Sequence, residues 1–311
     1  MPEHKLKKTA TAAPLVIWRF VDGKPGHENQ TQGLIDALSD LTQVKTCELK
    51  PVSNWQAIKY IFKKSFPRQN CEKPSLILGA GHRTHLSVLA AKKSVGGQSV
   101  IMMKPSLPTA LFDYCIVPEH DGLSSSRRIV TTLGVINRIK PFADHDEKQG
   151  LMLIGGPSAH YGWHDDALLE RIIMLVEQKD MQWALTTSRR TPASFIEKLK
   201  ATQIENLNIY LAEETTANWL PDKLQQAGQV WITEDSVSMV YEALTSGADC
   251  GVLPVQRKKE NRVSAGIDHL IEEKRLTSFD DWMSRKKLMA NQTPICEAKR
   301  VAEYLLEHVR S

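Results

Sequence analysis

The sequence has no long run of apolar residues. Nowhere do about eighteen of them follow one another, which is the length that a membrane-spanning helix needs. The N-terminal stretch carries lysines but no sustained apolar segment before Leu15, and the segment that begins there soon reaches Arg19 and Asp22. This pattern predicts neither a signal peptide nor a transmembrane helix.

A strong excess of charge of either sign is also missing. The 40 Lys and Arg residues against 36 Asp and Glu residues leave a formal net charge of +4. Such a balance is not typical of a general nucleic-acid binder, and it favours only a weak attraction to anionic partners. We therefore expect no nucleic-acid partner.

Cysteine is scarce and scattered. The five cysteines are odd in number and far apart, and none lies in a Cys-x-x-Cys or Cys/His spacing typical of a metal site. We expect reduced, buried thiols in a cytoplasmic protein that holds neither a metal nor a resident cofactor. The five positions are Cys47, Cys71, Cys115, Cys250 and Cys296.

The length of 311 residues is about twice that of a usual domain, which predicts two domains. Both halves repeat one rhythm of apolar strand, polar loop and helix, which favours two doubly wound α/β domains. A charged stretch, 143–149, precedes a fresh apolar strand and is interpreted as a linker. We predict an N-terminal domain at 1–145, a second domain at 146–285, and a C-terminal segment, 286–311, that carries an amphipathic helix.

Polar residues follow the first predicted strand, 14–21. The loop DGKPGHENQ leads from this strand to a helix expected from about Gln30, and a second loop, GAGHRTH, follows the strand expected at 75–78. In open α/β sheets such loops lie at the carboxyl edge, where binding sites form. The alternative is a pair of solvated turns, in which His27 only decorates the start of a helix. The candidates from the first loop are Asp22, Gly23, Lys24, Gly26 and His27.

The histidines of these two loops also invite a metal-site interpretation. His82 and His85 lie in the second loop, but no tight ligand spacing joins them to His27, and Arg83 is unfavourable beside a cation. We therefore expect no metal site there.

Three loops of the second half carry groups suited to phosphate. They read GGPS, SRR and EDSVS, and each follows a predicted strand. Glycine lets the backbone approach a ligand closely, and the planar guanidinium of Arg donates two parallel N–H bonds to phosphate. Taken singly, the serines can be caps and the arginines solvated. The candidates are Gly155, Gly156, Ser158, Ser188, Arg189, Arg190, Glu234, Asp235, Ser236, Val237 and Ser238.

The stretch 229–254 has the pattern strand, tight turn, helix, strand. We expect Asp235 or Ser236 to cap the helix, because a side-chain oxygen there accepts N–H groups of the first turn. The N–H groups that stay free, together with the positive end of the helix dipole, favour an anion beyond the strand end.

Residues 54–66 predict a basic amphipathic helix. Its apolar positions share a broad face, whereas Lys59, Lys63 and Lys64 stay on the polar side. Such a helix can lie on an anionic bilayer. The alternative is that its apolar face packs on the sheet.

Four segments, in their order and spacing, resemble one family. DGKPGHENQ, GGPSAHYGW, TTSRRTP and TEDSVSMVYEAL look like the bacterial and plant proteins of the mitochondrial fission, or elongated-mitochondria, family, whose members are treated as glycosyltransferases of the GT-B fold. The resemblance extends from about residue 17 to 276. It implies two Rossmann-type domains that face each other across a cleft, a nucleotide-sugar donor bound mainly in the C-terminal domain, and a final helix that returns to the N-terminal domain.

The same resemblance implies roles for single residues. Glu242 matches the acidic residue that takes the ribose hydroxyls of the donor in GT-B enzymes. The first loop, ending in His27, is more distantly similar to that of the N-acetylglucosaminyltransferase that makes lipid II, which implies that His27 acts as the base. In the mechanism that we expect, His27 or Asp22 takes the proton of the acceptor hydroxyl. No DxD motif follows a predicted strand, so we expect a metal-independent transfer in which the diphosphate is stabilised by the helix dipole with Arg189 or Arg190.

The acceptor is expected to be a cell-envelope lipid or oligosaccharide, with the protein peripheral at the inner face of the membrane. Two alternatives stay open. A nucleotide-sugar 2-epimerase can use the same architecture, and a non-catalytic scaffold can keep the fold only to bind partners.

Overall fold

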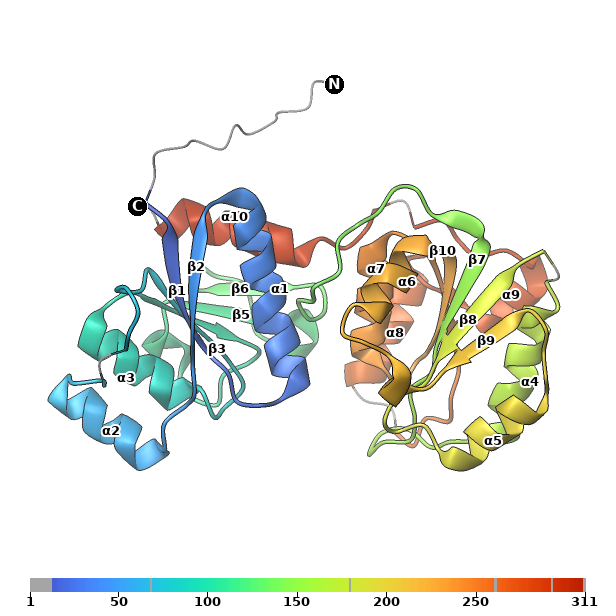
Figure 1. The fold of residues 1–311 in the computed structure, drawn as a ribbon, viewed down its shortest axis with the longest axis horizontal. Helices are drawn as coiled ribbons and strands as arrows, with labels where there is room; N and C mark the ends of the chain where they lie inside the picture. The colour runs from blue at the N-terminus through green and yellow to red at the C-terminus, as the bar shows by residue number, and fades with distance from the viewer. Residues whose placement is uncertain (1–12, 68, 179, 260–261, 292, 310–311) are drawn as a thin grey trace, which may run out of the picture. The chain divides into compact units, whose positions relative to one another are not determined.

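The computed structural model describes residues 13–67, 69–178, 180–259, 262–291 and 293–309. They divide into two compact units. Unit 1 holds the described residues up to Arg138 together with those from Glu297 onward, and unit 2 is Ile139–Cys296. Each unit contains one parallel six-stranded sheet with helices on its faces (Figure 1). The predicted fold class, two doubly wound α/β domains, is confirmed.

In unit 1 the strand order is β2-β1-β3-β4-β5-β6. The chain steps from β1 to one side, then returns and continues on the other side, so the direction of winding reverses between β1 and β3. In open α/β sheets a crevice forms at such a point, outside the carboxyl ends of the strands. The strands are β1 (Leu15–Phe20), β2 (Val44–Leu49), β3 (Leu76–Ala80), β4 (Gln98–Met102), β5 (Tyr114–Pro118) and β6 (Ile129–Thr132).

Helices cover both faces of this sheet. On one face, α1 packs with α10, and Leu34, Leu38 and Leu305 are buried there with side chains of β1 and β3. On the other face, α2 and α3 pack together, and Ala57 and Val88 are buried there. The helices are α1 (Pro25–Leu41), α2 (Asn54–Lys63), α3 (His85–Val95), α10 (Glu297–Val309) and the short 3-10 helices η1 (Thr109–Leu111) and η2 (Glu119–Asp121).

Unit 2 repeats the arrangement, with the strand order β12-β11-β10-β7-β8-β9. Here the winding reverses between β7 and β10. The strands are β7 (Asp146–Leu153), β8 (Gln182–Thr186), β9 (Leu207–Tyr210), β10 (Ala227–Thr233), β11 (Asp249–Leu253) and β12 (Thr277–Ser278). The helices are α4 (Asp165–Val176), α5 (Ala193–Ala201), η3 (Ala212–Glu214), α6 (Trp219–Gln226), α7 (Val237–Ser246), α8 (Arg262–Glu272) and α9 (Phe279–Arg285).

The units divide at other residues than those expected from the linker-like stretch. Unit 2 begins at Ile139 rather than 146, because the stretch before β7 is attached to the end of α7. The backbone N–H of Phe142 donates to the carbonyl oxygen of Ser246 at 2.9 Å, and Nε2 of His145 lies 3.2 Å from the same oxygen. The segment 286–296 also stays with unit 2, and only α10 joins unit 1.

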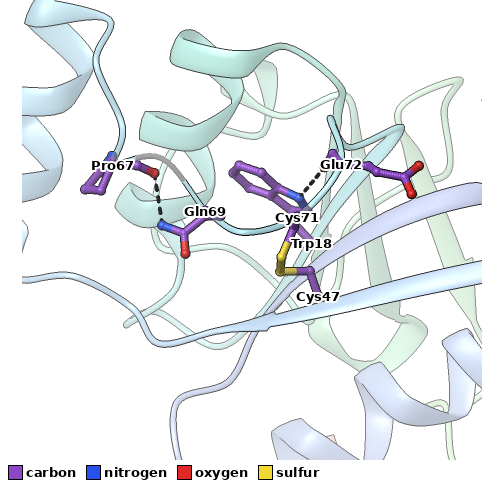
Figure 2. Close-up of a disulfide and its surroundings, with 6 residues drawn as sticks. All are labelled: Trp18, Cys47, Pro67, Gln69, Cys71 and Glu72. Atoms are coloured by element: carbon purple, nitrogen blue, oxygen red, sulfur yellow. Dashed lines mark hydrogen bonds between the residues drawn. A yellow bond between two sulfur atoms is a disulfide. The ribbon is translucent and has the colours of Figure 1, made fainter.

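A disulfide joins Cys47 and Cys71 in unit 1, with 6.3 Å between their Cα atoms (Figure 2). The expectation of reduced thiols throughout is therefore wrong for this pair, and it no longer supports a cytoplasmic location. The two cysteines meet because Trp18 of β1 is the register partner of Cys47 and its indole N–H donates to the carbonyl oxygen of Glu72 at 3.0 Å. Spacing in the sequence does not show this proximity.

The other three cysteines are in no disulfide: Cys115 and Cys250 are buried and Cys296 is half-buried. Burial raises the pKa of the Cys115 thiol to about 11 and also raises that of Cys250. Since the thiolate is the reactive form, both core thiols are unreactive near neutral pH.

Candidate functional site

Asp22 and His27 form a pair at the carboxyl end of β1. Nδ1 of His27 lies 2.9 Å from Oδ2 of Asp22, and the other carboxylate oxygen accepts from the backbone N–H of Lys24 at 3.2 Å. The Asp22 side chain is 1% exposed and the His27 side chain 17%. A buried carboxylate at this distance holds the imidazole in one orientation and favours the tautomer with the proton on Nδ1. The second ring nitrogen, Nε2, is then left as a proton acceptor.

Helix α1 begins earlier than predicted and carries His27 in its first turn. Pro25 stands at the start, where its missing N–H costs nothing and its fixed φ suits a helix. The buried Arg19 of β1 ties this turn to the sheet: its Nη2 donates to the carbonyl oxygen of Glu28 at 2.8 Å and its Nε to Thr31 at 2.9 Å. Arg19 was not predicted as a site residue, although a charged residue inside an apolar strand is a usable indication.

The ring of His27 lies against Gly81, which follows β3. A Cβ atom added to Gly81 would stand 2.2 Å from Cε1 of His27, and the φ of +75° at this position also requires glycine. The loops after β1 and β3 therefore close on each other where the winding of unit 1 reverses. This is the place at which a doubly wound sheet offers its crevice.

Other residues of these two loops have different surroundings from the pair of Asp22 and His27. Gly23, Lys24 and Gly26 are exposed, and a Cβ added at either glycine meets nothing within 4 Å. His85, in contrast, is buried. Its Nδ1 lies 3.2 Å from the hydroxyl of Ser106, and burial, followed by repulsion from His82, lowers the pKa of its imidazole. His85 thus has the surroundings of a core residue.

Asp235 connects the three predicted phosphate loops of unit 2. Its Oδ2 accepts from the backbone N–H of Gly156 at 2.9 Å and from Nη2 of Arg190 at 2.8 Å. The side chain of Asp235 is fully buried, and its Oδ1 has no partner within the described residues. The loops after β7, β8 and β10 are therefore joined through one carboxylate, at the point where the winding of unit 2 reverses.

The two glycines of this loop bring protein segments together. A Cβ atom on Gly155 would stand 2.2 Å from Oδ2 of Asp235, and one on Gly156 would stand 2.2 Å from the carbonyl oxygen of Arg190. We expected these glycines to let the backbone approach a ligand. What they approach in this structure are the neighbouring loops.

The two arginines have different surroundings. Besides Asp235, the guanidinium of Arg190 donates to the carbonyl oxygens of Gly156 and Pro157, so it is engaged in joining the loops. Arg189 is exposed and makes no hydrogen bond or ion pair with any residue that the structure describes. Thr191, which was not predicted, contributes as well: its hydroxyl donates to the carbonyl oxygens of Ile154 and Gly155.

Helix α7 starts without a side-chain cap. Ser236 occupies the N-cap position, but its side chain accepts no hydrogen bond from the first turn, and Asp235 is engaged with Gly156 and Arg190. The predicted capping is therefore wrong. The first-turn N–H groups, among them those of Val237 and Ser238, have no side-chain cap, which is the condition under which a helix start attracts an anion.

The remaining candidates are held locally or lie further along α7. The hydroxyl oxygen of Ser158 accepts from the backbone N–H of Tyr161 at 3.2 Å, and that of Ser188 accepts from the N–H of Arg190 at 3.2 Å. Glu242 is half-buried on α7, between its first and last turns.

Glu234 is buried and is held in an ion-pair network with the partly exposed Arg257 and Asp268. It accepts from Nε of Arg257 at 2.9 Å and from the N–H of Val255 at 3.1 Å, and Arg257 also binds both carboxylate oxygens of Asp268. Burial raises the pKa of the Glu234 carboxyl, and the bonds from Arg257 and Val255 oppose that rise. The hydrogen bond with Asp268 is the main cause that holds the pKa of Arg257 above its usual value, and Glu234 acts in the same direction. This network was missed, although Arg257 follows the carboxyl end of β11.

Neither a cluster of metal ligands nor a membrane-spanning helix is present among the described residues. No group of three or more His, Cys, Asp and Glu side chains in that part of the chain is placed to hold a metal ion. Among the same residues, no helix combines the length and the apolar character that crossing a bilayer demands.

The family profile described as "Mitochondrial fission ELM1" matches residues 25–309. The chain belongs to this family. The resemblance drawn from the four sequence segments is thereby confirmed. A relative among curated sequences is an uncharacterized protein of Rickettsia prowazekii (strain Madrid E), 22% identical, in an alignment that covers 93% of this chain and 97% of that protein.

Solved structures with a similar fold are named as UDP-N-acetylglucosamine 2-epimerases. A candidate enzyme of this kind from Listeria monocytogenes has a TM-score of 0.66 and 12% identity, with 96% of each chain covered. The enzyme from Neisseria meningitidis, solved bound to UDP-GlcNAc, has a TM-score of 0.54 and 11% identity, with 95% of this chain and 100% of that chain covered. At such identities the similarity shows the fold alone, and it agrees with the predicted GT-B-like architecture.

Proposed function

We propose that this protein is a glycosyltransferase that moves a sugar from a nucleotide-sugar donor to a hydroxyl group of a cell-envelope lipid or oligosaccharide. The observation that carries the proposal is the pair of Asp22 and His27. An imidazole held by a buried carboxylate at a strand's carboxyl end has the arrangement of a general base. A fold kept only to bind partners does not need such a pair.

His27 takes the proton of the acceptor hydroxyl in this scheme. The carboxylate of Asp22 accepts a hydrogen bond from the Nδ1–H group of His27, so Nε2 of His27 is available to the acceptor hydroxyl. As the proton moves to Nε2, the acceptor oxygen bonds to the anomeric carbon of the donor sugar, and the bond from that carbon to the diphosphate oxygen breaks. The carboxylate of Asp22 stabilises the imidazolium that results.

Unit 2 holds the donor in the same scheme. Uncapped N–H groups at the start of α7 and the exposed Arg189 stabilise the departing diphosphate, with no metal in this role. Glu242 of α7 accepts hydrogen bonds from the ribose hydroxyls. The Neisseria structure, with UDP-GlcNAc bound in a similar fold, supports a nucleotide-sugar as the ligand.

A second candidate function is nucleotide-sugar 2-epimerisation. The solved structures described above favour it, because both are named as 2-epimerases. An epimerase needs no acceptor, and this difference separates the two functions by experiment.

The first test is a thermal-shift series with UDP-, GDP-, ADP-, CMP- and TDP-sugars. A ligand that binds only the native state stabilises it by about 2.7 kcal/mol at a hundred times its Kd. We expect one nucleotide class to raise the Tm and Glu242→Ala to lose the shift. Glu197→Ala, on an exposed position of α5, is the matched control and keeps it. No shift with any nucleotide-sugar would favour a non-catalytic scaffold.

The second test uses the stabilising donor alone and then with an extract of envelope lipids and oligosaccharides. Sugar transfer that requires the extract supports the proposed transferase. Formation of the 2-epimer from the donor alone would replace it with the epimerase.

A further inference from the structure

Helix α2 lies on the outside of unit 1, beside α3 (Figure 1). Its inner side is attached to the core: Ala57 is fully buried, and Tyr60 and Ile61 pack against the same apolar cluster. A reciprocal capping box between Ser53 and Gln56 fixes its start. The helix is thus a firmly placed element of unit 1, and its exposed side chains keep a defined arrangement.

The outer side of α2 carries three exposed apolar residues. Trp55 is 84% exposed, Phe62 is 83% exposed and Ile58 is 37% exposed. Their spacing of three and then four residues puts them on one stripe of the helix. Among the described residues, Trp55 and Phe62 are the large hydrophobic side chains that reach half exposure. Two aromatic rings left in water on one rigid stripe indicate a binding surface.

Positive charge flanks this stripe. Lys59 follows Trp55 by four residues, Lys63 follows Lys59 by four, and both are exposed. Residues at this spacing lie one above the other along a helix, so the two lysines run beside the apolar stripe. Lys64 ends the helix, and the sequence of α2 contains no acidic residue.

We propose that this surface, formed by Trp55, Ile58, Phe62, Lys59 and Lys63, docks unit 1 on an anionic lipid bilayer. A helix that lies in the interface buries its apolar side between headgroups and acyl chains, and aromatic rings favour that depth. The lysines beside the stripe reach the lipid phosphates. The docking does not depend on the catalytic activity proposed above.

A second copy of this chain fits the surface less well. In a two-fold dimer the same patch meets itself, so Lys59 and Lys63 of each copy would face lysines again. An anionic bilayer supplies the complementary charge that such a dimer lacks.

Flotation with vesicles tests the proposal. The full-length protein should float with vesicles of phosphatidylcholine containing about 30% phosphatidylglycerol and not with phosphatidylcholine alone, and raising the salt to about 0.5 M should weaken the binding. The double variant Trp55→Ser, Phe62→Ser should bind at least about tenfold more weakly. Leu111→Ser, at a 46% exposed position of unit 1 outside α2, is the matched control and binds like the wild type.

A charge variant completes the test. Lys59→Glu, Lys63→Glu should lose binding to the phosphatidylglycerol vesicles while its circular dichroism melting curve stays unchanged, because both side chains are exposed. Absence of wild-type flotation, or flotation that neither double variant reduces, would overturn the proposal. So would a concentration-dependent dimer that the Trp55 and Phe62 variant dissociates, since the occupant would then be a second copy.

Discussion

The imidazole of His27 and the buried carboxylate of Asp22 lie 2.9 Å apart, on the first turn of α1 and at the end of β1. If His27 is the base, His27→Ala and Asp22→Asn should each reduce kcat by about 10²- to 10⁴-fold, because positioned proton transfer contributes that much. Donor affinity should stay unchanged, since the proposed donor site lies in unit 2. Steady-state kinetics together with donor titration measures both quantities.

A matched histidine variant controls for loss of a titrating group. His269, on α8, is 59% exposed, so His269→Ala should keep full turnover. A His27→Ala variant that turns over like the wild type would remove His27 from the mechanism.

The junction at Asp235 should be important for the stability of unit 2. Asp235→Ala removes the acceptor of both Gly156 and Arg190, and we expect the free energy of unfolding to fall by about 1–3 kcal/mol. The partly exposed guanidinium of Arg190 and the unpartnered Oδ1 limit the loss. Urea unfolding gives the value. Asp166→Ala, which breaks an exposed pair with Lys198, should leave stability unchanged, and equal stability of the two variants would contradict the assignment.

The disulfide joins Cys47 and Cys71, which are 24 positions apart in the sequence. Cross-links of this kind stabilise by about 2–4 kcal/mol, largely by restricting the unfolded chain. Dithiothreitol should therefore lower the free energy of unfolding of the wild type and of Cys296→Ser by this amount, but not that of Cys47→Ser, Cys71→Ser. Alkylation of both thiols without prior reduction, detected by mass spectrometry, would show that the bond is absent.

Buried His85 should make stability depend on pH. Its pKa in the folded chain lies below the ordinary 6.5, so the unfolded chain takes up the proton first as the pH falls. The stability that the neutral imidazole of His85 contributes is fully present above pH 6.5. It is lost as the pH falls from that value toward the lower pKa of His85 in the folded chain. The free energy of unfolding should fall between about pH 7.5 and 5.5. This decrease in the free energy of unfolding should be smaller in His85→Gln and as large as in the wild type in the exposed control His269→Gln. An equal dependence on pH in the wild type and both variants would contradict the role of His85.

The sequence predicts the elements of this protein better than it predicts their contacts. Apolar runs and polar loops indicate two parallel sheets with site residues at the strand ends. They do so because burial requires apolar residues to recur at the spacings of strands and helices. The partners of each loop depend on the strand order. Only the position of β3 beside β1 puts Gly81 against His27, and only that of β10 beside β7 puts Asp235 against Gly156.

The sequence pattern alone also cannot tell which of two residues of the same type is exposed and which is engaged with a partner. Arg189 and Arg190 are neighbours in the sequence, but one is exposed and the other holds Asp235. Glu234 looked like a binding residue beside Asp235, whereas a distant residue, Arg257, engages it in the interior. These roles depend on the direction in which each side chain points from its loop, and packing in the folded chain sets that direction.

Helix α10 completes unit 1 although it follows unit 2 in the chain. Val301, Ala302 and Leu305 of this helix are fully buried in the core that α1 also covers. During translation, all of unit 2 leaves the ribosome before these three side chains. Unit 2 can therefore fold first, while the apolar face of α1 in unit 1 stays open until α10 has been synthesised, and during that interval the nascent chain is exposed to chaperones and to aggregation.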